Sequence, residues 1–188
     1  MTVWYTHTLS RWIVFAASLV STGCVVNAVK PLDSTAPDLR SDHALVVLGI
    51  TVKGSWPYSQ FGVILDQYDV HTQRITGNCF SYNRIEAVVP ATPTPTRFFA
   101  FDAPSGHYIF SAFNGSTLGQ MEQAFQALPG HAVYIGNFVL GDSGIVTLRK
   151  DLAERQSLIA QALPHLPAAL EMAAARTVAP AKPFMCTP

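Results

Sequence analysis

Between Ala44 and Leu148 the sequence is a succession of short apolar segments separated by turn residues, and this pattern constrains the fold most. The segments are rich in Val, Ile, Phe and Tyr, which favour strands. We expect strands in Ala44–Val52, Phe61–Val70, Thr72–Tyr82, Arg97–Asp102, His107–Phe113, the second half of Thr117–Ala127, His131–Leu140 and Ile145–Leu148, and Glu86–Pro90 is a candidate for a further short strand. About seven or eight strands with turns about every 8–12 residues predict a mainly β protein, an antiparallel β-sandwich or barrel, and we favour the sandwich.

The hydrophobic period changes to that of helices near the C-terminus. Asp151 and Glu154 have the spacing of a capping box, which predicts a helix over Leu152–Leu163. Its apolar residues fall on one face, so we expect this helix to pack on the sheet. A second helix is expected over Ala168–Arg176, after a proline that favours a helix start. The sandwich should therefore carry C-terminal helices over about residues 151–177, followed by a tail.

The N-terminal segment has the organisation of a secretory signal. Arg11 precedes the apolar run Trp12–Val20, and the small residues Ser21–Gly23 lead to Cys24. A cation, a short apolar core and small residues form a signal peptide. The apolar run has about half of the ~20 residues that a membrane-spanning helix needs, so we expect residues 1–23 to be removed on export.

The end of this segment, Ser-Thr-Gly-Cys, resembles the lipobox of bacterial lipoproteins. The resemblance implies that Cys24 is the lipidated residue, although Ser21 stands where the family usually has Leu. Two or more acyl chains anchor a protein stably in a membrane, whereas one does so only marginally. Val25, in place of the Asp that retains such proteins in the inner membrane, favours the outer membrane facing the periplasm. Cleavage near Gly23 without lipidation is the alternative.

The rest of the chain divides into a linker and one domain. Residues 24–42 contain prolines and no sustained periodicity, which predicts a lipid-anchored tether. Residues 43–188 are enough for a single β-sandwich domain with its C-terminal helices and tail. The net charge is zero and only 13% of residues are charged, without a basic cluster. This composition argues against nucleic acid as a partner.

Two further cysteines, Cys79 and Cys186, remain once Cys24 carries lipid. An even pair in an oxidising compartment predicts a disulfide. It would close a loop of about 107 residues, which the chain-entropy model associates with up to ~4–5 kcal/mol of stabilisation. The alternative is two unrelated thiols, one buried and one in a loose tail.

Gly141-Asp142-Ser143-Gly144 resembles the nucleophile segment of chymotrypsin-like proteases, whose serine needs a histidine base. The resemblance ends after these four residues, because Ile145 and Val146 replace the Gly and Pro of that family, and no Ala-Ala-His segment lies upstream. We interpret the segment as a turn between two strands. Ser143 should be exposed with no histidine in reach, and Asp142 should cap the turn through the backbone.

The histidines His43, His71, His107, His131 and His165 are far apart in sequence. None of them has the spacing of a metal-binding motif, and neither paired carboxylates nor a phosphate loop accompanies them. His107 and His131 are the pair that neighbouring strands could bring together. We predict no catalytic residues, no metal site and no cofactor.

Two stretches carry a family resemblance, Phe101–Tyr108 (FDAPSGHY) and Pro129–Gly136 (PGHAVYIG). Their turns and following strands resemble uncharacterised bacterial lipoproteins with a prealbumin-like β-sandwich domain. The resemblance implies a fold and an envelope location, and it carries no catalytic residues.

These features favour a non-enzymatic envelope lipoprotein that reaches the membrane through its lipid and binds another envelope component or has a structural role. A periplasmic hydrolase whose site forms only in the fold is the first alternative. A small-molecule carrier is the second, and it would have an enclosed apolar cavity between sheet and helices.

Overall fold

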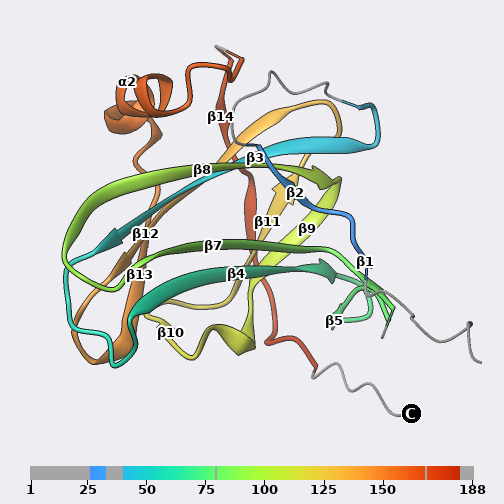
Figure 1. Ribbon diagram of the computed structural model, residues 1–188. Helices are drawn as coiled ribbons and strands as arrows, with labels where there is room; N and C mark the ends of the chain where they lie inside the picture. Colours follow the sequence, from blue (N-terminus) through green and yellow to red (C-terminus); the bar gives the residue numbers. More distant parts are fainter. Residues whose placement is uncertain (1–25, 33–39, 79, 168, 183–188) are drawn as a thin grey trace, which may run out of the picture.

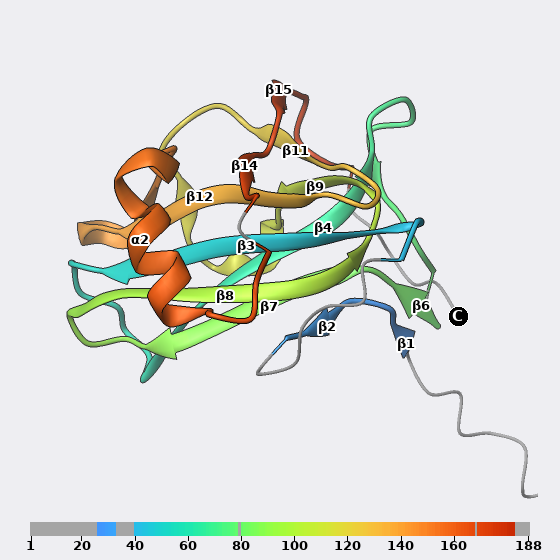
Figure 2. The same cartoon turned by 90° about the horizontal axis from the view of Figure 1, so that it is seen from above.

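A computed structural model describes residues 26–32, 40–78, 80–167 and 169–182. Two β-sheets pack face to face, and the helix α2 (Leu152–Ala162) lies on the outer side of one of them (Figures 1 and 2). The predictions of a mainly β fold, of a sandwich and of a C-terminal helix on it are confirmed.

The first sheet contains the most buried strands of the protein. Its order is β10-β13-β12-β3-β8-β2, and β14 pairs with a further part of β12. The strands are β2 (Lys30–Pro31), β3 (His43–Val52), β8 (Thr94–Pro104), β10 (Thr117–Leu118), β12 (Ala132–Leu140), β13 (Ile145–Arg149) and β14 (Glu171–Met172). Every residue of β3 and β12 is buried. One face of these strands meets the other sheet, and the opposite face is covered by α2 and the residues that follow it.

The neighbours β3 and β12 run parallel, so this sheet is mixed rather than purely antiparallel. Parallel neighbours require a long crossover connection. Here the chain between β3 and β12 forms most of the second sheet before it returns.

The second sheet has the order β15-β11-β9-β4-β5, and β7 pairs with the earlier part of β4, on the same side as β5. Its strands are β4 (Gln60–Asp69), β5 (Arg74–Ile75), β7 (Arg84–Pro90), β9 (Gly106–Phe110), β11 (Gln123–Ala127) and β15 (Ala175–Thr177). Residues of β4 alternate between the core and the outer face, as the pleat requires. Asp66 is on the outer face, opposite Arg84 of β7 and Ile109 of β9.

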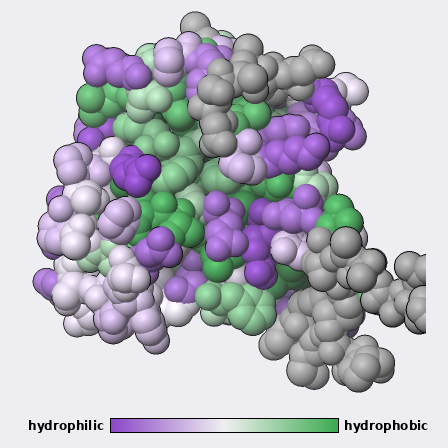
Figure 3. All heavy atoms as spheres, viewed as in Figure 1, coloured by the Kyte–Doolittle hydropathy of each residue, from purple (hydrophilic) through white to green (hydrophobic). Residues whose placement is uncertain are grey.

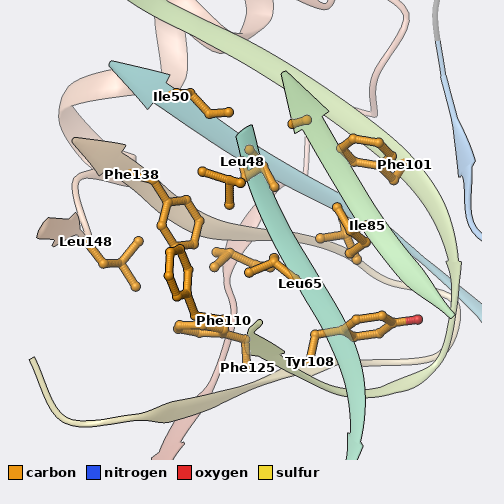
Figure 4. Close-up of a cluster of buried hydrophobic side chains, with 14 of the residues drawn as sticks. Leu48, Ile50, Leu65, Ile85, Phe101, Tyr108, Phe110, Phe125, Phe138 and Leu148 are labelled. Atoms are coloured by element: carbon orange, nitrogen blue, oxygen red, sulfur yellow. The ribbon is translucent and has the colours of Figure 1, made fainter. Parts of the chain in front are cut away.

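Aromatic and branched aliphatic side chains from both sheets fill the space between them (Figure 4). Phe110 and Phe138 stack across the core with ring centroids 5.8 Å apart. The Tyr108 hydroxyl donates a hydrogen bond of 2.8 Å to the carbonyl oxygen of Pro104, so that a fully buried ring keeps a partner for its polar atom. A smaller apolar cluster, which includes Leu45, Tyr134 and Ile159, joins the outer side of the first sheet to α2.

The N-terminal residues that we predicted as a tether are in part docked on the sandwich. The strand β1 (Val26–Asn27) pairs in parallel with β6 (Ser81–Tyr82), and β2 pairs with β8. The side chain of Val29 is buried in the core. The prediction of a tether is therefore wrong for residues 26–32, whose own apolar and amide side chains provide the contacts.

The predicted second helix, Ala168–Arg176, is wrong. In its place lie β14 and β15, with Ala173 donating a backbone hydrogen bond of 2.8 Å to Tyr134 and Ala174 accepting one of 2.7 Å from Gln126. The segment thus bonds to an edge of each sheet. The helix propensity of this Ala-rich segment is high but small in energy, and pairing the backbone groups that the open sheet edges would otherwise leave unpaired outweighs it.

Two short helical turns interrupt the strands, η1 (Ala112–Asn114) and η2 (Asp142–Gly144).

The helix α2 begins at Leu152 as predicted, but the predicted capping box is wrong. The Asp151 side chain makes no capping hydrogen bond. It is turned toward Tyr134 and Arg155 instead.

Candidate functional site

The candidate site is the end of the sandwich where the described chain begins. Cys24, Cys79 and Cys186, the predicted lipidation and disulfide residues, all lie outside the described residues. Val26 follows Cys24 by two residues, so covalent geometry limits the distance between their Cα atoms to about 7 Å. A lipid on Cys24 would therefore enter the membrane close to β1.

Asn27 fastens this end of the chain to the sandwich. Its side-chain amide donates to the carbonyl oxygen of Arg84 at 2.8 Å, and its Oδ1 accepts from the Arg84 backbone N–H at 3.0 Å. The same Oδ1 accepts from the N–H of Val29 at 3.1 Å. Val26 adds a backbone hydrogen bond of 2.8 Å to Phe80. One amide side chain thus connects β1 to β7 in the same way as a paired strand would.

Arg84 also forms a buried ion pair beneath this attachment. Its Nε donates to Asp66 Oδ1 at 2.6 Å, and the Ser111 hydroxyl donates to Asp66 Oδ2 at 2.5 Å. Asp66 and Ser111 are each 1% exposed. Burial by itself lowers the pKa of Arg84, but the hydrogen bond and the charge of Asp66 raise it above its ordinary value. Each oxygen of the buried carboxylate therefore accepts a hydrogen bond, and these two bonds offset the cost of removing the charge from water.

The sequence alone did not lead us to predict this cluster, although it contains one signal of it. Asp66 interrupts the apolar segment of β4. A buried acid in such a segment needs a charged or hydrogen-bonding partner. The identity of the partner depends on strand register, which the pattern of apolar residues does not specify.

The described residues that come before Cys186 and on either side of Cys79 are held by backbone contacts. Lys182 forms a bridge with Arg74, and its N–H donates to the carbonyl oxygen of Gln73 at 3.1 Å. The chain on either side of Cys79 turns back through a hydrogen bond of 2.7 Å from Asn78 N–H to Ser81. The disulfide between Cys79 and Cys186 stays a prediction.

A second polar cluster holds the start of α2. The Tyr134 hydroxyl donates to Asp151 Oδ1 at 3.2 Å, and Arg155 Nε donates to Oδ2 at 3.1 Å. The Asp151 side chain is 5% exposed and that of Arg155 is 23% exposed. Burial, and then the charge of Asp151, raise the pKa of the Tyr134 hydroxyl. The hydroxyl therefore stays protonated and acts as a donor.

The histidines with a charged partner are in separate places. The buried His43 has Nδ1 at 2.6 Å from Asp102 Oδ1 and its Nε2 against the Arg40 guanidinium. His131 pairs with Glu171 at 2.6 Å on the surface. His107 belongs to β9 in the second sheet, whereas His131 precedes β12 in the first, so the fold does not pair them in one sheet. Within the described ranges, no three His, Cys, Asp or Glu side chains are close enough to share a metal ion.

The Gly-Asp-Ser-Gly segment forms the turn η2 between β12 and β13, as predicted. Ser143 is exposed and has a positive φ of 59°, and the turn closes through a 2.9 Å hydrogen bond from Gly141 N–H to Ile145. Among the described residues, no histidine is hydrogen-bonded to Ser143. The predicted cap by the Asp142 side chain is absent from the hydrogen bonds of this turn.

A shallow apolar groove of about 270 Å³ runs between α2 and the segment that follows it. Ile159 and Leu163 line one side, and Leu166 and Leu170 line the other. The groove opens to the solvent, unlike the enclosed cavity that a small-molecule carrier would have. A surface of this kind suits a contact with another macromolecule more than the enclosure of a ligand.

No protein-family model, no curated protein and no solved structure matches the chain. The resemblance to prealbumin-like lipoproteins thus stays a prediction. Among the described residues, no helix has the length and apolar character needed to cross a membrane.

Proposed function

We propose that this chain is an exported lipoprotein of the bacterial envelope, anchored through lipid on Cys24, whose β-sandwich binds another envelope component without catalysing a reaction. The observation that carries the proposal is the close attachment of β1. The first described residue, Val26, lies two residues beyond Cys24, and Asn27 fastens β1 to β7 through hydrogen bonds of 2.8 and 3.0 Å.

This attachment suits an anchored protein for a physical reason. A lipid anchor with two or more chains fixes one point of the protein in the membrane. Because residues 26–32 are docked, that point is tied directly to the folded domain and not to a long linker. The sandwich would then stay close to the membrane, in the orientation that the attachment imposes. Val25 supports a position in the outer membrane, facing the periplasm.

The opposite end of the molecule supports the binding part of the proposal. The helix α2 and β1 lie on opposite sides of the sandwich in both Figure 1 and Figure 2. The apolar groove beside α2 would therefore point away from the membrane, where a partner in the envelope can reach it. Exposed apolar surface beside polar residues is typical of contacts between proteins.

Replacing Cys24 by Ala tests the anchor. In cells of the native host, we expect Cys24→Ala to leave the membrane fraction or to accumulate as an unprocessed precursor, because the acyl chains can no longer be attached. Ser143→Ala is the control, since it changes an exposed turn residue and keeps all three cysteines, and it should remain with the membranes. A Cys24→Ala protein of mature size that still fractionates with membranes would contradict the proposal.

A further inference from the structure

The surface beside β1 exposes large apolar side chains. Val26 is 56% exposed, Phe80 is 65% exposed and Phe113 is 60% exposed. Together with the half-buried Tyr82 and Arg84 they form what we call the anchor-end patch. Figure 3 shows apolar atoms at the edge of the molecule on the side where Figure 1 places β1. Single exposed apolar residues are ordinary, but a group of them at one end indicates a contact surface.

Specific contacts hold this patch together. Val26 bonds to the carbonyl oxygen of Phe80 at 2.8 Å through its N–H. The Arg84 guanidinium lies 5.4 Å from the centroid of the Tyr82 ring and 5.5 Å from that of Phe113. Arg84 is also the residue that Asn27 fastens to β1. The aromatic rings of Tyr82 and Phe113 therefore lie against the residue to which β1 is fastened.

We propose that the anchor-end patch rests in the interfacial region of the lipid bilayer. The proposal relies on the lipid anchor at Cys24 that is proposed above. With the Cα atoms of Cys24 and Val26 at most about 7 Å apart, acyl chains on Cys24 bring the patch to the headgroup region. Tyrosine is enriched at this depth, where its ring leaves water and its hydroxyl stays wet, and phenylalanine side chains insert at the boundary between headgroups and acyl chains.

The charge of Arg84 does not oppose this contact. The ion pair with Asp66 at 2.6 Å balances it inside the protein, and the guanidinium already lies against two aromatic rings. An arginine side chain can lie along apolar surface while its charged group stays near water or a counter-ion. The patch thus offers a lipid surface apolar area without an unpaired buried charge.

The register of β4 and β7 supplies a reference point at the other end of the sandwich. Arg84 pairs with Asp66, whereas Gln60 at the start of β4 pairs with Pro90. The six residue steps from Gln60 to Asp66 span about 20 Å of strand. Tyr58, which precedes β4 and is 71% exposed, therefore lies far from the patch. It provides an exposed aromatic residue for comparison with Phe80.

Tryptophan fluorescence in membranes tests the proposal. The full lipidated protein would carry either Phe80→Trp or Tyr58→Trp, in vesicles of phosphatidylethanolamine and phosphatidylglycerol that contain lipids brominated near the glycerol. Trp56 is the one tryptophan beyond residue 23, so the parent protein supplies the background emission. Phe113→Trp is a second reporter within the patch. All the positions substituted are exposed, so the fold should tolerate a ring of similar kind.

We expect the brominated lipids to remove most of the emission of Trp at position 80 and of Trp at position 113, with a blue shift on binding. Trp at position 58 should keep its emission. Equal emission from positions 58 and 80 in membrane-bound, lipidated protein would overturn the bilayer contact but leave the anchor intact. A protein without lipid on Cys24, found by its mass, would instead contradict the proposed function itself.

Discussion

The two outer faces of the sandwich each hold a buried carboxylate paired with an arginine, but different parts of the chain supply the partners. On the second sheet, Asp66 pairs with Arg84 of the neighbouring strand and with Ser111. On the first sheet, Asp151 pairs with Arg155 four residues later and with Tyr134. The first cluster joins distant segments, whereas the second mainly fixes the beginning of a helix.

The difference shows how each end of the molecule is held. Arg84 connects β7 to β4 through Asp66 and to β1 through Asn27, so the chain leaving toward Cys24 is attached to an outer strand that is itself tied to β4 by a buried ion pair. The helix α2 depends on one aspartate and on a small apolar cluster at the surface of the first sheet. We therefore expect the end near Cys24 to resist local opening more strongly than the end with α2.

The largest expected effect in this comparison is that of Asp66→Ala. The change leaves the Arg84 guanidinium and the Ser111 hydroxyl without their acceptor in a buried place. Breaking a buried pair in this way costs about 3 kcal/mol, toward the lower end because Arg84 is partly exposed. Urea denaturation measures the loss. A loss below about 1 kcal/mol would mean that water replaces the carboxylate and that the cluster does not hold the end of the chain.

A smaller loss is expected for Asp151→Ala, about 2 kcal/mol. Arg155 can turn to water, but the buried Tyr134 hydroxyl loses its acceptor. Tyr134→Phe is the matched variant, since it removes only one hydrogen bond and keeps the ion pair, and it should cost about 1 kcal/mol. Both are measured in the same denaturation experiment. If Asp151→Ala destabilises the protein more than Asp66→Ala does, the proposed difference between the two clusters is wrong.

The smallest expected effect concerns His107 in the outer face of the second sheet. Burial, then the charges of Arg176 and His71, lower the pKa of His107 below its ordinary value of 6.5. The unfolded chain therefore takes up a proton that the folded chain resists, and stability decreases as the pH falls below about 6.5.

The variant His107→Gln removes this dependence. Near pH 8 the variant and the parent should differ little through this effect, and below about pH 6 the variant should lose less stability than the parent. Denaturation at several pH values measures the difference. If the free energies of unfolding of the variant and the parent change with pH in parallel across this range, His107 does not cause the loss of stability at low pH.

The sequence predicted where the strands are better than it predicted which strands lie next to each other. The segments of β3, β4 and β12 stand out because branched and aromatic residues are confined between turns, but the same pattern fits parallel and antiparallel partners. The second helix failed because Ala173 and Ala174 complete two sheet edges, which no local pattern reveals. Asp66 and Arg84 are likewise brought together by register alone.

The signal and the lipidation of Cys24 rest on the sequence, and the docking of residues 26–32 came only from the structure. The apolar and amide side chains of Val29 and Asn27 lie in a segment whose prolines suggested a tether. Their contacts become favourable only when β6 and β7 are already in place. A local reading of the segment therefore underestimates how much of it folds.

The intact mass of the protein extracted from its native membrane tests the central claim most directly. The account predicts a mature chain that begins at Cys24 and carries the added mass of its acyl chains. A chain that begins at another residue, or that begins at Cys24 without any added lipid, would contradict it.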